Sequence, residues 1–312
     1  MFRMNKSSPT GSRTVSKNDR ALLSSIGEYQ AVSIRQLAAI SNRSNQVIRR
    51  RLRFLKDQDL IIKKPLCYGR KQGRPEEIIL LSQQGLKLSV ANDALLPAPI
   101  KSEDIKFHTI DHELLLNWFR IHLIQMERVI PSLSIKYIPT KAPSAKGQTP
   151  FRMHLPAEKT HERKKAVIPD GIFTVLNIQI GKALLFFLEV DMGSETLICS
   201  KKKTNNIHHK ILCYQELYRS GHYKSLEEIF GSTFKGFRLL FLTDSEARTA
   251  ALCRFAQATQ NSDFIWLTDR YRMFDHGLAA NIWVRGGKYQ APRESILGRN
   301  LAVESRIKAC FD

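Results

Sequence analysis

The sequence predicts an α/β protein with two domains, and three observations lead to this prediction. The chain of 312 residues is long enough to build two hydrophobic cores. Segments with helical apolar spacing alternate with short apolar runs typical of strands, such as 184–188 and 237–242. The stretch LLPAP at 95–99 is typical of a linker and separates a basic first part from the remainder.

The charge of the chain is large and unevenly distributed. The formal net charge is +20, and residues 1–75 hold 17 Lys and Arg against 4 Asp and Glu. Such an excess predicts a polyanionic partner, bound mainly by the first domain. No run of about 18 apolar residues occurs, so we expect no membrane span. Five scattered cysteines without a CxxC pair favour a reducing cytoplasm.

Three helices are expected in the first domain, after a polar and basic arm at residues 1–16. Each helix is preceded by a residue whose side chain can accept a backbone N–H. Ser33, with Gln36 three residues later, forms a capping-box pattern. The expected helices run from Asn18 or Asp19 to near Gly27, from Ile34 to Ile40, and, with Ser44 or Asn45 as cap, from Gln46 to about Asp59.

The third helix carries the main signal for DNA binding. Its apolar side chains recur near helical spacing and should face the core: Val47, Ile48, Leu52 and Leu55. Asn and Gln can read adenine and Arg can read guanine in the major groove. The alternative interpretation is that these polar residues only form a solvated helix face. The candidate DNA contacts here are Arg43, Asn45, Gln46, Arg49, Arg50 and Arg53.

A basic hairpin follows, with strands expected at 60–62 and 78–81 and a glycine-rich tip between them. Three helices followed by the order RRRLRFLKDQDLI and then GRPEEIILLSQQG resemble the winged helix-turn-helix family over roughly residues 18–90. The resemblance implies a domain at 17–94 that binds double-stranded DNA, with wing contacts from Arg70, Lys71 and Arg74. Winged-helix modules often bind palindromic DNA sites as dimers, so a homodimer is possible for this protein.

The second domain should begin with a helix at about 105–129, whose apolar stripe includes Leu115, Phe119 and Val129. His108 and His112 are four residues apart on this helix, a spacing that can bind zinc. No third ligand is evident, so histidines on the helix surface are the favoured interpretation. A strand at 132–138 and a long polar loop over 139–165 are expected next.

Acidic residues flank a predicted hairpin with strands at 172–176 and 183–190. A turn centred on Ile180-Gly181 would place Asp170 opposite Asp191, and a centre one residue earlier would place it opposite Glu189. Residues two apart on a strand share a face, so all three carboxylates should gather at one edge. Clustered carboxylates usually imply a bound divalent cation or a shared proton.

Pro169-Asp170 and Glu189-x-Asp191 resemble the PD-(D/E)xK motif of the restriction-endonuclease-like superfamily. The resemblance implies that Asp170 and Glu189 hold Mg²⁺ or Mn²⁺ and that the ion activates water to cut DNA. Asp191 stands where that family has its lysine. Two arrangements could compensate for this change. Lys210 on the following helix could be a displaced catalytic lysine, or Asp191 could be a third metal ligand. The non-functional interpretation is that Lys210 is a solvated helix residue. In that superfamily an acidic residue on the preceding helix often joins the metal site, which makes Glu113 a weaker candidate for this site.

The chain then alternates a strand at 237–242, a helix that Thr243 should cap, and a strand at 264–267. This order predicts a nuclease-like α/β domain with a central mixed sheet over 100–299, followed by a tail at 300–312. The segments HELLLNWF, PDGIFTV, FFLEVDMGSET and KILCYQELY, after a winged-helix start, resemble the replication-relaxation family of plasmids and mobile elements.

Two functions are therefore expected. The first is a cytoplasmic DNA-binding protein of mobile-element replication or transfer that nicks or cuts DNA as a Mg²⁺-dependent endodeoxyribonuclease. The alternative is a catalytically inactive winged-helix regulator or replication initiator, and recruitment of other replication or transfer factors is a third option. Neither a small-molecule cofactor nor a membrane partner is expected.

Overall fold

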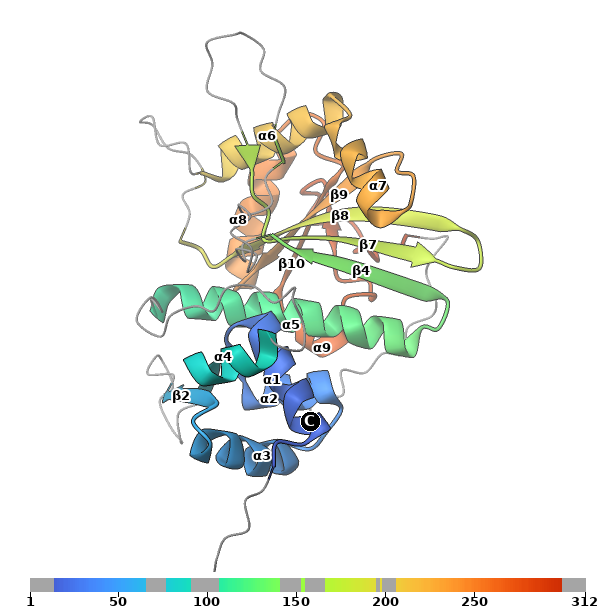
Figure 1. Ribbon diagram of the computed structural model, residues 1–312. Helices are drawn as coiled ribbons and strands as arrows, with labels where there is room; N and C mark the ends of the chain where they lie inside the picture. Colours follow the sequence, from blue (N-terminus) through green and yellow to red (C-terminus); the bar gives the residue numbers. More distant parts are fainter. Residues whose placement is uncertain are drawn as a thin grey trace, which may run out of the picture. The chain divides into compact units, whose positions relative to one another are not determined.

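The chain folds as two units, residues 1–99 and 100–312, which are described separately (Figure 1). The computed structural model describes residues 14–65, 77–90, 107–140, 153–154, 166–194, 197 and 206–298. The linker at 95–99, most of the expected arm and the expected tail lie outside these residues. Within the described part, no helix combines the length and apolarity needed to cross a membrane.

The N-terminal unit contains the three expected helices and a small antiparallel sheet in the order β1-β3-β2. Strand β1 was not expected, because two residues are too few to show an alternating pattern. Its residues pair with Ile78 and Ile79 of β3. The elements are α1 (Lys17–Tyr29), β1 (Val32–Ser33), α2 (Ile34–Ser41), α3 (Asn45–Asp57), β2 (Ile61–Pro65), β3 (Glu77–Leu81) and α4 (Gln83–Val90).

Side-chain caps set the helix starts of this unit. Ser33 and Gln36 form the predicted capping box of α2, and Ser44 caps α3. The predicted cap of α1 is wrong, because Ser16 takes that position and Asp19 completes a second capping box. Asp19 is fully buried, and Arg51 of α3 forms an ion pair with its carboxylate. The ion pair therefore links the first helix to the third.

The C-terminal unit is built on a six-stranded mixed sheet in the order β11-β10-β9-β8-β7-β4. Strands β8, β9 and β10 are parallel, and the other neighbours are antiparallel. A short pair, β5 and β6, lies within and beside the expected loop 139–165. The strands are β4 (Leu133–Pro139), β5 (Met153–His154), β6 (Ala166–Val167), β7 (Gly171–Asn177), β8 (Lys182–Asp191), β9 (Phe237–Thr243), β10 (Ile265–Asp269) and β11 (Val284–Arg285).

Helices cover both faces of this sheet (Figure 1). One core joins the sheet to α6, α7 and α8, and a second core joins it to α5 and α9. Leu185 and Phe187 of β8 enter the first core, whereas Phe186 and Leu188 enter the second, as expected for a central strand. The helices are α5 (Phe107–Val129), α6 (Ile207–Arg219), the 3₁₀ turn η1 (His222–Ser225), α7 (Leu226–Phe230), α8 (Glu246–Gln257) and α9 (Arg270–His276).

Helix α5 is buried over more of its circumference than its predicted stripe. Leu115 and Phe119 are buried as expected, but Val129 is 57% exposed because it is the last residue of the helix. Polar residues are buried on α5 as well, including His122, whose ring lies 5.7 Å from that of Phe274. Burial lowers the pKa of His122 to about 4.

We expect acid to destabilise the protein through His122. Between the ordinary pKa of 6.5 and the folded value of about 4, the unfolded chain binds a proton that the folded state excludes. The free energy of unfolding should therefore fall by ~3 kcal/mol as the pH is lowered through this window. Urea denaturation at several pH values measures the slope, which His122→Gln should reduce and the exposed control His222→Gln should not. An unchanged slope in His122→Gln would contradict the prediction.

Candidate functional site

The register of the β7–β8 hairpin decides which acids face each other. Gly171 pairs with Leu188 and Asn177 with Lys182, so Asp170 lies across from Glu189 when the register is extended by one residue. This is the second of the two predicted registers. The Asn177 side chain accepts the backbone N–H of Gln179 at 3.0 Å, which tightens the turn one residue before the Ile180-Gly181 centre.

Each residue of the Pro169-Asp170-Gly171 motif has a local structural role. The Thr140 hydroxyl donates a hydrogen bond to the Pro169 carbonyl oxygen. The Asp170 carboxylate accepts the backbone N–H of Val190 at 2.7 Å, which fixes it against β8. A Cβ atom at Gly171 would collide with the end of the Tyr137 ring, so the glycine leaves room for that ring to lie over β7.

Glu189 is buried and both of its oxygens are engaged. Lys210 Nζ lies 3.0 Å from Oε2, and the Tyr214 hydroxyl donates to Oε1 at 2.6 Å. These partners are one turn apart on α6, whose first turn is capped by Asn206. Lys210, predicted as a displaced lysine, therefore does reach the acidic edge from the following helix.

Burial shifts the pKa values of Glu189 and Tyr214. Burial raises the pKa of Glu189, the Lys210 ammonium lowers it and the nearby Asp170 carboxylate raises it, so that the net direction is upward. Burial and the charge of Glu189 raise the pKa of Tyr214 well above its ordinary value. Tyr214 thus remains a hydrogen-bond donor, and Lys210 is the neighbouring cation that favours an ionised Glu189.

Asp191 has polar partners of its own. Its Oδ2 accepts from Nε of Arg248 on α8 at 2.7 Å, and its Oδ1 accepts the backbone N–H of Gly193 at 2.9 Å. Among the described residues, no three His, Cys, Asp or Glu side chains are placed to hold a metal ion. Arg248 and the Gly193 backbone thus engage the third expected carboxylate, whereas the charges of Asp170 and Glu189 interact with each other.

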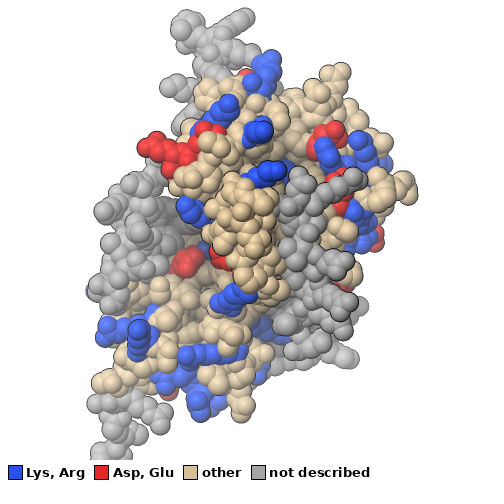
Figure 2. Space-filling view, turned by 90° about the vertical axis from the view of Figure 1, so that its right-hand side faces the viewer, with Lys and Arg blue, Asp and Glu red and all other residues tan. Residues whose placement is uncertain are grey.

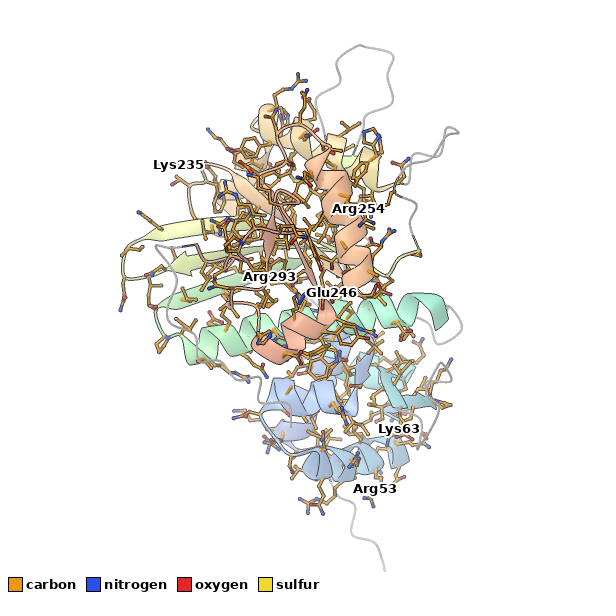
Figure 3. All side chains as sticks on the ribbon, turned by 180° about the vertical axis from the view of Figure 1, so that it is seen from behind. Arg53, Lys63, Lys235, Glu246, Arg254 and Arg293 are labelled. Carbon is orange, nitrogen blue, oxygen red and sulfur yellow. The ribbon has the colours of Figure 1, made fainter. Side chains whose placement is uncertain are left out.

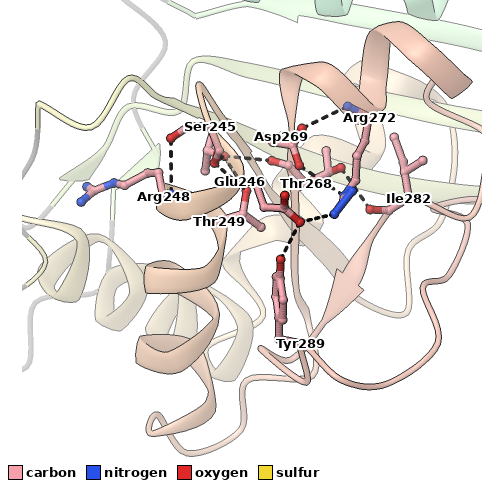
Figure 4. A network of polar contacts seen from close by, with 10 residues as sticks. Ser245, Glu246, Arg248, Thr249, Thr268, Asp269, Arg272, Ile282 and Tyr289 are labelled. Carbon is pink, nitrogen blue, oxygen red and sulfur yellow. Dashed lines mark hydrogen bonds and ion pairs between the residues drawn. The ribbon is translucent and has the colours of Figure 1, made fainter.

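A second polar network secures the start of α8 beside Asp191 (Figure 4). Ser245 caps the helix, which corrects the predicted cap Thr243; the Thr243 hydroxyl instead lies 2.6 Å from that of Thr249. Glu246 accepts a hydrogen bond from the Tyr289 hydroxyl at 2.8 Å and pairs with Arg272 of α9. These contacts hold α8 in the position from which Arg248 reaches Asp191.

His112 is a site residue that the sequence interpretation assigned to the helix surface. Its Nε2 lies 3.1 Å from Oδ2 of Asp170, and its Nδ1 lies 3.5 Å from Oε1 of Glu113. The His108 side chain lies outside the described residues. The two contacting groups are separated by 58 positions in the chain. Only the packing of α5 beside the hairpin brings them together, so no local spacing in the sequence could indicate the contact.

The candidate DNA contacts on α3 and in the turn before it are exposed, whereas Ile48, Leu52 and Leu55 of α3 are buried. Val47, a predicted core residue, is only half-buried. Lys and Arg side chains gather over the N-terminal unit (Figure 2), and Arg53 points away from it (Figure 3). The exposed set comprises Arg43, Asn45, Gln46, Arg49, Arg50 and Arg53, whereas Arg70, Lys71 and Arg74 lie outside the described residues.

Comparison with known proteins gives one family. The sequence model of that family, described as replication-relaxation, matches residues 23–233, about two-thirds of the chain. The match runs from α1 through α7 and includes Asp170, Glu189 and Lys210. No curated protein matches the chain.

We expect Asp191 to contribute to stability through Arg248. Asp191→Asn leaves the Arg248 guanidinium, only 16% exposed, without its carboxylate. The loss should be ~2–3 kcal/mol, below the 3–5 typical of fully buried pairs. In urea denaturation, Asp191→Asn/Arg248→Met should recover part of this loss, because both charges are then absent. Wild-type stability in the single variant would contradict the assignment.

Proposed function

The chain belongs to the replication-relaxation family, and from this premise we propose that it is a DNA-binding protein of mobile-element replication or transfer that nicks or cuts DNA. The N-terminal unit is proposed to bind double-stranded DNA. Asp170, Glu189 and Lys210 of the C-terminal unit are proposed to carry out metal-dependent hydrolysis of a phosphodiester. The observation that carries the proposal is the contact of Lys210 with Glu189 beside Asp170.

The chain order of the C-terminal unit supports this proposal. Helix α5, the antiparallel strands β4, β7 and β8, helix α6 and the parallel strand β9 occur in this order, with β5 and β6 after β4 and with η1 and α7 after α6. The four strands β4, β7, β8 and β9 are neighbours in the sheet. This arrangement is similar to the core that the PD-(D/E)xK resemblance implies. Lys210 brings an ammonium group to Glu189 although position 191 is an aspartate, and this contact supports Lys210 as the displaced lysine.

Asp170 and Glu189 are proposed to be sufficient protein ligands for a magnesium ion. Mg²⁺ is usually held by one or two protein carboxylates together with water and substrate phosphate, so a third acidic ligand is not required. When bound, the ion would polarise the scissile phosphate and favour deprotonation of the attacking water. Asp170 and Glu189 are the residues proposed to hold it.

The surrounding side chains are proposed to orient these acids and to balance charge. The backbone N–H of Val190 fixes Asp170, and the Tyr214 hydroxyl fixes Glu189. The Lys210 side chain is 29% exposed, so its ammonium can reach both Glu189 and an incoming phosphate. A cation held in this position would stabilise negative charge that develops on the phosphate during hydrolysis.

DNA binding is proposed to use α3 as the recognition helix of a winged helix. The exposed arginines Arg49, Arg50 and Arg53 supply contacts to phosphates and guanines, and Asn45 and Gln46 lie at the start of the helix, where side chains commonly reach base edges. Arg51 is not part of this surface because Asp19 binds it. Wing contacts from Arg70, Lys71 and Arg74 remain a proposal.

One observation favours the alternative, a regulator or initiator without catalysis. Lys210 and Tyr214 already satisfy both oxygens of Glu189, so the buried acid is stabilised without any metal ion. In that case the C-terminal unit would act as a scaffold, and DNA binding by the N-terminal unit would be the whole activity. Cleavage experiments distinguish the two functions.

Removing the exposed arginines of α3 should weaken DNA binding and its salt dependence. For Arg49→Ala/Arg50→Ala/Arg53→Ala, the slope of log K against log salt should shrink by ~2–3, since each lost phosphate contact contributes ~0.9. Fluorescence anisotropy on a DNA duplex between low and moderate salt measures the slope. Lys87→Ala, an exposed cation on α4, is the control. An unchanged slope in the triple variant would exclude α3 as the main contact.

Substituting the proposed catalytic residues should abolish cleavage and spare DNA affinity. Asp170→Asn, Glu189→Gln and Lys210→Met are each expected to reduce nicking of supercoiled plasmid in Mg²⁺ or Mn²⁺ by ~100-fold or more. Lys235→Met, an exposed lysine just before β9 (Figure 3), is the matched control and should cleave normally. If the wild-type protein cleaves no DNA with either ion, the regulator function replaces the nuclease function.

A further inference from the structure

Two side chains at the start of α9 suggest how the acidic edge receives its substrate. Tyr271 is 54% exposed, and the Arg270 guanidinium lies 5.0 Å from the centroid of its ring and donates a hydrogen bond to its hydroxyl at 3.0 Å. We propose that Tyr271 stacks on an unpaired base of single-stranded DNA while Arg270 contacts a phosphate of the same strand. The inference rests on the proposed function and adds to it the strand preference of the C-terminal unit.

The ends of three parallel strands place Tyr271 on the same sheet edge as the proposed catalytic acids. Asp191 of β8 pairs with Thr243 of β9, and Thr243 pairs with Asp269 of β10. Neighbouring strands lie ~4.8 Å apart, so Asp269 is ~10 Å from Asp191 along this row. Tyr271 follows two residues after Asp269. A DNA strand with one phosphate at Glu189 would therefore reach Tyr271 within a few nucleotides.

Contacts on both sides hold the start of α9 in place (Figure 4). Asp269 caps the helix by accepting the backbone N–H of Arg272 at 3.0 Å. The Arg272 side chain pairs with Asp269 and with Glu246 of α8, and Met273 is fully buried in the second core. An aromatic ring on a helix that is fixed in this way is already positioned, which lowers the entropy lost when a base binds.

The other exposed tyrosine among the described residues has a different environment. Tyr218 is 45% exposed, but its ring packs beside the rings of Tyr223 and Phe264, each 5.9 Å away. Within the described part of the chain, the ring of Tyr271 instead has a cation as its neighbour. An exposed ring beside a guanidinium matches the two parts of a nucleotide, because the ring can stack on the base and the guanidinium can bind the phosphate.

The chemistry of this pair favours a single strand over a duplex. Bases in a duplex are paired and stacked on each other, so an aromatic side chain reaches the face of a base only where the strand is open. Stacking on tyrosine tolerates any base, and a guanidinium has several N–H donors for phosphate oxygens. The N-terminal unit would then bind duplex DNA, whereas the C-terminal unit would engage an opened strand.

The test measures binding of a single-stranded DNA oligonucleotide to the full-length protein without a divalent metal ion, which separates binding from cleavage. The oligonucleotide carries a fluorescent adenine analogue whose emission falls when it stacks on an aromatic ring, and fluorescence anisotropy gives the affinity. Tyr271→Ala removes the ring and Tyr271→Phe keeps it. Tyr218→Ala is the control, because its exposure is similar. Circular dichroism confirms that the variants fold.

We expect Tyr271→Ala to bind the single strand ~5–100-fold more weakly and to lose the fall in emission, because stacking of one base contributes about this much. Tyr271→Phe and Tyr218→Ala should bind like the wild type, and the affinity of Tyr271→Ala for a duplex should be unchanged. Wild-type affinity and emission in Tyr271→Ala would overturn the inference, as would a wild-type protein that binds no single strand.

These outcomes are separate from those of the cleavage experiment. If the wild type nicks plasmid in Mg²⁺ or Mn²⁺ but Tyr271→Ala binds the single strand normally, the stacking role fails and the nuclease function stands. If the wild type nicks no DNA but binds the single strand through Tyr271, the nuclease function fails and the stacking role stands.

Discussion

The burial of Glu189 is the constraint on which the arrangement of the C-terminal unit depends. A carboxylate at the end of a central strand, only 2% exposed, loses its hydration and requires partners. Lys210 and Tyr214 provide a cation and a hydrogen bond, both from one face of α6. The helix must therefore pack with that face on β8, and the same packing places Phe187 against Tyr214 in the core.

Asp170 and Asp191 show how the same sheet edge separates three similar acids. Asp170 and Asp191 both lie within one residue of the end of a strand and both are buried, yet their side-chain partners come from different helices. Asp170 meets α5 through His112, and Asp191 meets α8 through Arg248. Arg248 of α8 thus pairs with Asp191, whereas Asp170 and Glu189 stay close enough for their charges to interact.

The arginines of α3 divide in a similar way. Arg51 is adjacent in sequence to Arg50, but the helical rotation turns it toward α1, where buried Asp19 binds it. Arg49, Arg50 and Arg53 remain on the exposed side. Composition alone counts these four residues as equivalent cations, whereas the packed helix separates one stabilising arginine from three that are available to a polyanion.

The sequence by itself determined the elements whose signals are local. It predicted α2 and its capping box, the β7–β8 hairpin and the two-sided burial of β8, because caps, turn residues and apolar runs act within a few residues. Only the tertiary structure decided between the two hairpin registers. Moving the centre of the turn by one residue shifts every pairing by two residues, which keeps each side chain on its face while changing its partner. It also decided the contacts of Lys210, Arg248 and His112 with the acidic edge, because these depend on how three helices pack against one sheet.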